Sequence, residues 1–189
     1  MDAVTTAQRM TAAEFLALPP LENGHLRQLI DGEVVVNAPS WTHGDSLVAI
    51  VTALRNWVRA GSARGGVNVP VDVLLDNYNV YEPDVVWYRD GRAPRRGDPP
   101  PYAVPDIAVE VRSPSTWRYD IGLKKATCER QGVAELWLVD TAADVVLVFR
   151  RSVPATQEFD VSEEFATDET LSSPLLPGFT LRVDEIFGG

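Results

Sequence analysis

The chain has 189 residues, of which 45% are hydrophobic and 23% are charged, as in ordinary globular proteins. No apolar run approaches the roughly 20 residues of a membrane-spanning helix, and the N-terminus lacks the pattern of a secretory signal. The single cysteine, Cys128, excludes an intrachain disulfide and a cysteine zinc cluster. We therefore expect one cytoplasmic domain over residues 1–189, with a flexible tail at 1–10 and no membrane association.

The net charge of −10 argues against a simple nucleic-acid binder, because non-specific DNA affinity comes mostly from Lys and Arg. Positive charge is instead local, in a Pro- and Gly-rich stretch over residues 89–102 that contains Arg89, Arg92, Arg95 and Arg96. Its composition predicts a long connection between strands. For its last three arginines, a solvated loop is slightly favoured over a phosphate-binding patch.

The N-terminal third predicts a helix, a hairpin and a second helix. Thr11 and Glu14 form a capping box for a short helix that ends before Pro19. The runs RQLI and EVVV on either side of Asp31-Gly32 predict two strands joined by a tight hairpin turn. Apolar residues at helical spacing then predict an amphipathic helix over about 45–60.

The remaining two thirds predict strands around one further helix. Alternating or continuous apolar patterns indicate strands at 67–75, 83–88, 105–112, 135–140 and 144–150. A helix is expected over 120–131, with Gly132 as its stop. The acidic stretch 157–170 reads as an edge strand or loop, and 179–187 as a strand with a helical turn. This order predicts an α/β fold with a mixed central sheet flanked by helices.

Glu110 is the most informative single residue. It lies in the middle of an apolar strand. Its side chain is on the face opposite the core positions Ile107, Val109 and Val111. A carboxylate there stays charged only if a cation or several donors compensate it. One interpretation is a structural salt bridge to Arg112 or Lys124, which the strand alone favours. The other is a divalent metal ligand facing a cleft.

Asp84 strengthens the metal interpretation. It follows Pro83 at the head of another apolar strand, so neighbouring strands would bring its oxygens close to those of Glu110. Mg²⁺ is usually bound by one or two carboxylates together with water and substrate phosphates. A basic residue beside such a pair activates water or stabilises developing charge. Lys124 is the better general base, because arginine does not lose its proton, and Arg112 is the better phosphate clamp.

Several segments together resemble a known family. They are LIDGEVVVNAPSWTHGD, YEPDVVW, PDIAVEVRSPST, DIGLKKATCERQGVAELWLVD and LPGFTLRVDEIF, in this order. The chain resembles, from about Thr11 to Phe187, the Uma-type restriction-endonuclease family within the PD-(D/E)XK nuclease superfamily. The resemblance implies a restriction-endonuclease-like fold. It also implies Mg²⁺ or Mn²⁺ held by Asp84, Glu110 and the backbone carbonyl of Val111.

Four further positions take roles from the same resemblance. Arg112 stands where the superfamily has its strand lysine, and Lys124 on the following helix is the expected equivalent of that lysine. His43 and Glu33 match histidine and acidic positions near the family's site, which implies substrate contacts. For His43, an equally favoured interpretation is a polar residue ahead of a helix with no role in the site. For Glu33, it is a carboxylate at the edge of a strand.

The function implied is a metal-dependent endonuclease that hydrolyses DNA phosphodiester bonds, acts as a homodimer, and uses Asp84, Glu110 and Lys124 in catalysis. Two alternatives stay open. The net charge favours an interaction or regulatory protein that keeps the nuclease fold without activity. A small-molecule phosphodiesterase with the same metal centre is the other, because an acidic surface is less of a handicap for it.

Overall fold

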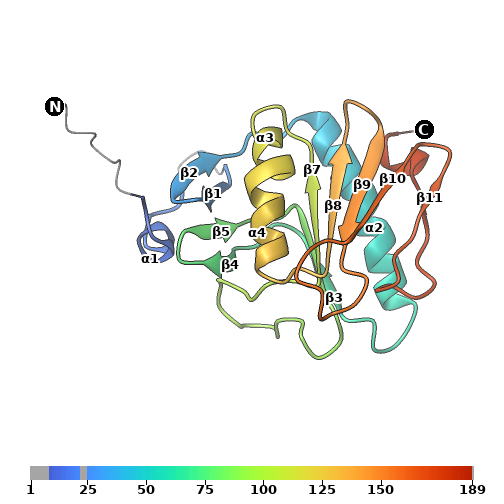
Figure 1. Ribbon diagram of the computed structural model, residues 1–189, viewed down its shortest axis with the longest axis horizontal. Helices are drawn as coiled ribbons and strands as arrows, with labels where there is room; N and C mark the ends of the chain where they lie inside the picture. Colours follow the sequence, from blue (N-terminus) through green and yellow to red (C-terminus); the bar gives the residue numbers. More distant parts are fainter. Residues whose placement is uncertain (1–8, 22–24, 189) are drawn as a thin grey trace.

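The computed structural model describes residues 9–21 and 25–188. Its centre is a six-stranded sheet in the order β10-β9-β8-β7-β6-β3 (Figure 1). β7 and β8 are parallel, whereas the other neighbouring strands of this sheet are antiparallel, so the expected mixed sheet is confirmed. The strands are β3 (Gly66–Asn68), β6 (Val85–Tyr88), β7 (Ile107–Val111), β8 (Glu135–Asp140), β9 (Val145–Arg150) and β10 (Val161–Phe165).

A second sheet of four short strands lies beside the first, in the order β2-β1-β5-β4. Its strands are β1 (Arg27–Ile30), β2 (Glu33–Val36), β4 (Val73–Asp76) and β5 (Asn79–Tyr81). The β1–β2 hairpin is confirmed: Asp31 and Gly32 have φ values of 52° and 80°. This left-handed conformation at both turn residues is the one that the Asp-Gly pair favours.

The strand predicted over residues 67–75 is wrong. This segment forms β3 in the six-stranded sheet and β4 in the four-stranded sheet, with Pro70 between them. Proline has no backbone N–H to donate to a ladder, so the first strand ends before it and the chain changes sheets. The short strand β5, which pairs with both β1 and β4, was not predicted.

The first two helices begin at side-chain caps. Thr11 caps α1 (Ala12–Leu16), and the reciprocal bonds of its capping box with Glu14 are present as predicted. α2 (Trp41–Arg59) begins earlier than the sequence pattern indicates, because Ser40 accepts a hydrogen bond from the His43 amide at 3.2 Å. Within the described residues, no helix is long and apolar enough to cross a membrane.

The connection between the parallel strands β7 and β8 is helical. It consists of α3 (Trp117–Tyr119), a π-helical turn (Asp120–Lys124) and α4 (Lys125–Arg130), so the predicted helix begins earlier and contains a wider turn. Gly132 follows with a φ of 88°, which confirms it as the stop. Parallel strands need a crossover of this kind.

The two helical layers cover opposite faces of the six-stranded sheet (Figure 1). Val109 and Val111 of β7 belong to the core cluster that contains Leu54 of α2. Ala108, on the other face of β7, belongs to the cluster that contains Cys128 of α4. Since side chains alternate along a strand, Glu110 points to the α4 side, so its face is a second core layer.

The described residues nearest to the two ends of the chain contact the rest of the molecule. Residues 1–8 of the expected tail lie outside the described residues, but the Met10 amide donates to the Gly32 carbonyl at 3.0 Å. The acidic stretch 157–170 contains the edge strand β10, which confirms the edge strand over the loop that was its alternative. The chain closes with β11 (Thr170–Leu171), β12 (Leu181–Arg182) and a 3₁₀ turn (Asp184–Ile186).

Candidate metal and phosphate site

Two carboxylates meet where β6 begins and β7 ends. Val85 pairs with Val109 in antiparallel register, and continuing that register by one residue places Asp84 opposite Glu110. Opposite residues of an antiparallel pair carry their side chains on the same face, with Cβ atoms about 5 Å apart. Both side chains are buried. The structure therefore brings together the two carboxylates that the sequence singles out.

Asp84 is held by the backbone of β7 and approached by a histidine. Its Oδ2 accepts a hydrogen bond from the Val111 amide at 2.7 Å and lies 3.1 Å from His43 Nε2. His43 is buried in the first turn of α2, and neither of its ring nitrogens has a hydrogen bond from the described residues. The Asp84 contact is therefore close but outside hydrogen-bond geometry. His43 is thus a member of the cluster rather than a solvent-facing polar residue.

Lys124 lies buried between two carboxylates. Its Nζ is 2.7 Å from Glu110 Oε1 and 3.1 Å from Asp120 Oδ1. Of the two partners considered for Glu110, the structure shows Lys124. The angles of both contacts fall outside hydrogen-bond geometry, so Nζ and the two oxygens are without hydrogen bonds among the residues described. Asp120 and Lys124 are the first and last residues of the π-helical turn, a feature frequent at functional sites.

Burial and mutual interaction shift the pKa values of this cluster. Burial raises the pKa of Glu110 well above its ordinary value; the nearby Lys124 opposes the shift, and Asp120 and Asp84 add to it. Burial alone would lower the pKa of Lys124, but the Glu110 and Asp120 carboxylates raise it above its ordinary value. The two carboxylates therefore favour the ammonium form of Lys124, which argues against the general-base role expected from the sequence.

The donor set fits a divalent cation. Three carboxyl groups, those of Asp84, Glu110 and Asp120, share a buried space with the single basic side chain of Lys124, and a buried carboxylate without a cation is costly. Glu110 Oε1 and Asp120 Oδ1 also have lone pairs free of hydrogen bonds from the described residues. No three His, Cys, Asp or Glu side chains of the described chain form a ready cage for an ion. The arrangement thus suits an ion held by two carboxylates and completed by water, as is usual for Mg²⁺.

Two other predicted residues lie outside the buried cluster. Arg112 pairs with Asp140 at 2.7 Å and stacks over the Trp117 ring at 5.3 Å, so it does not neutralise Glu110. Its side chain remains 31% exposed, which leaves it accessible to a phosphate. Glu33, at the start of β2, is exposed, and its carboxylate lies 3.5 Å from the hydroxyl of Tyr119 in α3.

Asp120 is the site residue that sequence reasoning missed. Its side chain is 2% exposed and its Oδ1 contacts the Lys124 ammonium. The available signal was its four-residue spacing from Lys124, which places both side chains on one helical face. That spacing is common for surface ion pairs, so burial had to be known before Asp120 could be separated from an ordinary exposed pair.

Comparisons with known proteins identify the family of the chain and support its fold. The model of the Uma2 family, described as "Putative restriction endonuclease", matches residues 12–184. A solved structure of a protein from Anabaena variabilis ATCC 29413, described as a "putative nuclease belonging to DUF820", superposes with a TM-score of 0.77. The two chains are 20% identical over 95% of this chain and 98% of the other, so that likeness establishes the fold. No curated protein matches the chain.

Proposed function

Because the chain belongs to the Uma2 family, whose members are described as putative restriction endonucleases, we propose that it is a divalent-metal-dependent endonuclease that hydrolyses DNA phosphodiester bonds. The observation that carries the proposal is the meeting of Asp84, Glu110 and Lys124 in one buried cluster. Two carboxylates beside one ammonium provide the groups that metal-assisted phosphodiester hydrolysis requires. Fold alone would not support this activity, since one fold serves many functions.

Asp84 and Glu110, with the Val111 carbonyl, are the groups that would hold Mg²⁺ or Mn²⁺. When bound, such an ion lowers the pKa of water and neutralises phosphoryl oxygens. Val111 already positions the first of these carboxylates, because its amide donates to Asp84 Oδ2. His43 contacts the same oxygen and restricts the orientation of that carboxylate. The protein thus fixes the ligand geometry before substrate arrives.

Lys124 orients the attacking water and stabilises the negative charge that develops on the phosphate. An ammonium inside a buried cluster is well suited to charge stabilisation, since electrostatic interactions are stronger away from bulk solvent. Arg112, which is partly exposed, and Glu33, which is exposed, are the solvent-accessible members of the proposed site. The arginine contacts a phosphate of the strand, and the carboxylate contacts the substrate or its water.

Asp84→Asn tests the proposal with little change in shape. Removing one ligand charge should weaken Mn²⁺ binding by more than about 100-fold, because even outer-shell substitutions cost 10–100-fold. Calorimetric titration of Mn²⁺ measures the binding, and plasmid nicking on the same samples measures the chemistry. The exposed Asp168→Ala is the control for charge removal and should behave as wild type. Equal nicking by Asp84→Asn and wild type would sink the assignment.

A second candidate is a protein that keeps this fold without catalysis. The 2.7 Å contact between Lys124 and Glu110 favours it, because a compensated buried pair can be purely structural, and so does the net charge of −10. Wild-type protein that binds no Mn²⁺ at millimolar concentration would support this candidate.

We also propose that the protein is a homodimer that binds DNA, and sedimentation at micromolar concentration tests the dimer.

A further inference from the structure

The long loop over residues 89–102 holds its four arginines in two different environments. Arg89 Nε and Arg92 Nη1 contact the buried Asp106 Oδ1 at 2.6 and 2.5 Å. These two ion pairs anchor the start of the loop to the residue that precedes β7. At the other end, the Tyr102 amide donates to the Asp72 carbonyl at 2.7 Å. The loop is therefore anchored at both ends, and among the described residues the side chains of Arg95 and Arg96 make no hydrogen bond or ion pair that holds it.

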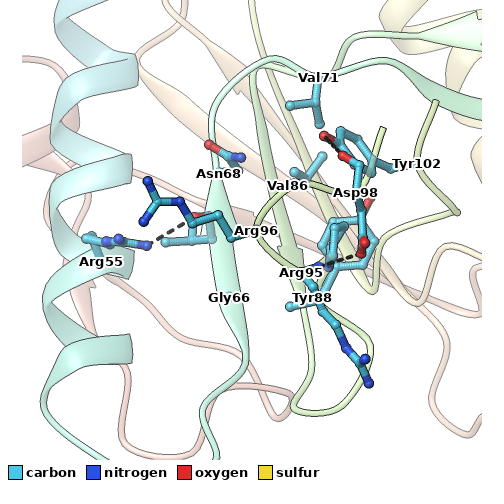
Figure 2. Close-up of a pocket in the computed structure, with 14 residues that line it drawn as sticks. Arg55, Gly66, Asn68, Val71, Val86, Tyr88, Arg95, Arg96, Asp98 and Tyr102 are labelled. Atoms are coloured by element: carbon cyan, nitrogen blue, oxygen red, sulfur yellow. Dashed lines mark hydrogen bonds between the residues drawn. The ribbon is translucent and has the colours of Figure 1, made fainter. Parts of the chain in front are cut away.

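Arg96 reaches from this loop toward Arg55 of α2, beside the edge strand β3 (Figure 2). The two side chains line a cavity of about 350 Å³, here called the Arg55–Arg96 cavity. Arg95 also lines it but extends away from this pair (Figure 2). Neither Arg55 nor Arg96 has an ion-pair partner within residues 9–21 and 25–188.

Two guanidinium groups that converge without a carboxylate repel each other, and a bound anion relieves that repulsion. Asp98, the one carboxylate among the described lining residues, accepts a hydrogen bond from the Arg95 amide at 2.7 Å. Asn68 adds a neutral donor: its Oδ1 accepts from the Val69 amide, which leaves its NH₂ group directed to the cavity side (Figure 2). Arginine matches phosphate oxygens in a bidentate manner, so this donor set suits a phosphate group.

We propose that the Arg55–Arg96 cavity binds a phosphate of a nucleic-acid strand at a distance from the Asp84–Glu110 cluster. This inference rests on the proposed function and specifies its substrate class. Tyr88, which lines the cavity, lies four residues from Asp84 at the far end of β6. At about 3.3 Å per residue, Asp84 and Tyr88 are about 13 Å apart along the strand. This distance corresponds to about four nucleotides along one nucleic-acid strand.

A substrate that reaches both places is a polynucleotide rather than a small phosphodiester. The cavity also explains how a chain with a net charge of −10 could bind DNA, because the local charge of its lining is positive. Phosphate contacts position a strand without reading its sequence. We therefore expect this cavity to add affinity and register without base specificity.

The test is the binding of a labelled single-stranded oligonucleotide of about 12 nucleotides, measured by fluorescence anisotropy in EDTA. Arg55→Ala and Arg96→Ala should each weaken binding by about tenfold, as expected for a charge-assisted contact. Each substitution should also weaken the salt dependence, so that the slope of log K against log salt becomes less negative by about 0.7. Arg59→Ala, one turn after Arg55 on the same helix and outside the cavity, controls for the loss of one positive charge.

Three results would overturn the proposal. The first is wild-type affinity in both cavity variants. The second is displacement of the oligonucleotide by an equal concentration of dAMP, which would identify a free nucleotide as the ligand. The third is equally effective displacement by polyglutamate, which would identify an acidic polypeptide. Because EDTA removes metal, any of these outcomes leaves the Asp84→Asn test of the catalytic cluster unaffected.

Discussion

At the scale of single residues, Lys124 is the side chain that compensates the carboxylates of the buried cluster. Its side chain is 2% exposed and contacts both Glu110 and Asp120, so removing it leaves two carboxylates without their nearest cation. Deleting one partner of a buried pair is much more costly than replacing the whole pair. The lysine therefore contributes to folding as well as to the proposed chemistry.

Lys124→Met should lower the free energy of unfolding by about 3 kcal/mol at neutral pH, because Met keeps the chain length but not the charge. Added Mn²⁺ should recover part of the loss, since the ion takes over the compensation of the carboxylates. Urea denaturation with and without Mn²⁺ measures both effects. The control is Lys125→Met, which loses a cation–π contact with Phe149 and should cost less than about 1 kcal/mol. Equal losses in the two variants would contradict this role of Lys124.

Sequence reasoning identified Asp84, Glu110, Lys124 and His43, and the structure places all four together. Three come from strand or helix patterns whose geometry is local, and the family resemblance added the histidine. The choice of partners could not be predicted in the same way. Arg112 turns to Asp140 of the neighbouring strand because that strand is adjacent in space and distant in sequence.

At the scale of elements, the best predicted parts are those that the local sequence determines. The β1–β2 hairpin follows from its Asp-Gly turn, and β8 with β9 follows from two apolar runs around a short turn. The assignment of strands to sheets was less predictable. The sequence pattern of residues 67–75 predicts one strand, yet these residues form strands of two different sheets. A proline such as Pro70 is compatible with an irregularity in one edge strand and with a boundary between two strands, and only the partner strands decide between them.

Two glycines give an element-scale test with opposite signs. Gly44 lies inside α2, and an added Cβ would meet no heavy atom within 4 Å, so Gly44→Ala should stabilise the protein by about 0.5–1 kcal/mol. Gly65, just before β3, has a φ of +72° and its added Cβ would lie 1.9 Å from the Tyr88 carbonyl oxygen. Gly65→Ala should therefore destabilise it by at least about 2 kcal/mol. Chemical denaturation measures both, and a shift of the same sign in both would refute this account.

At the scale of the whole molecule, a buried glutamate links the central sheet to the C-terminal segment. Glu135 of β8 accepts hydrogen bonds from the Trp137 indole at 2.5 Å and from the Ser173 hydroxyl at 2.8 Å. Burial raises the pKa of this carboxyl above its ordinary value of 4.5, and the two hydrogen bonds oppose the shift. The folded protein therefore holds the proton of Glu135 more tightly than the unfolded chain does.

This raised pKa predicts a pH dependence of stability. The stabilisation from protonated Glu135 is fully present below the unfolded pKa of 4.5 and is lost as pH rises through the higher folded pKa. Glu135→Gln, which cannot ionise, should remove this decline, so its stability relative to wild type should increase from pH 4 toward neutrality. Thermal unfolding across this range measures the difference. A constant difference between the two proteins would show that Glu135 does not titrate in the expected window.

The parallel pairing of β7 with β8 has a consequence for the order of folding. The members of the buried cluster come from four segments: His43 from α2, Asp84 from the start of β6, Glu110 from β7, and both Asp120 and Lys124 from the crossover. Contacts between distant segments form only after the entropy of closing the intervening loops has been overcome. We therefore expect the site to form late in folding, and a chain still emerging from the ribosome cannot assemble it before the crossover has been synthesised.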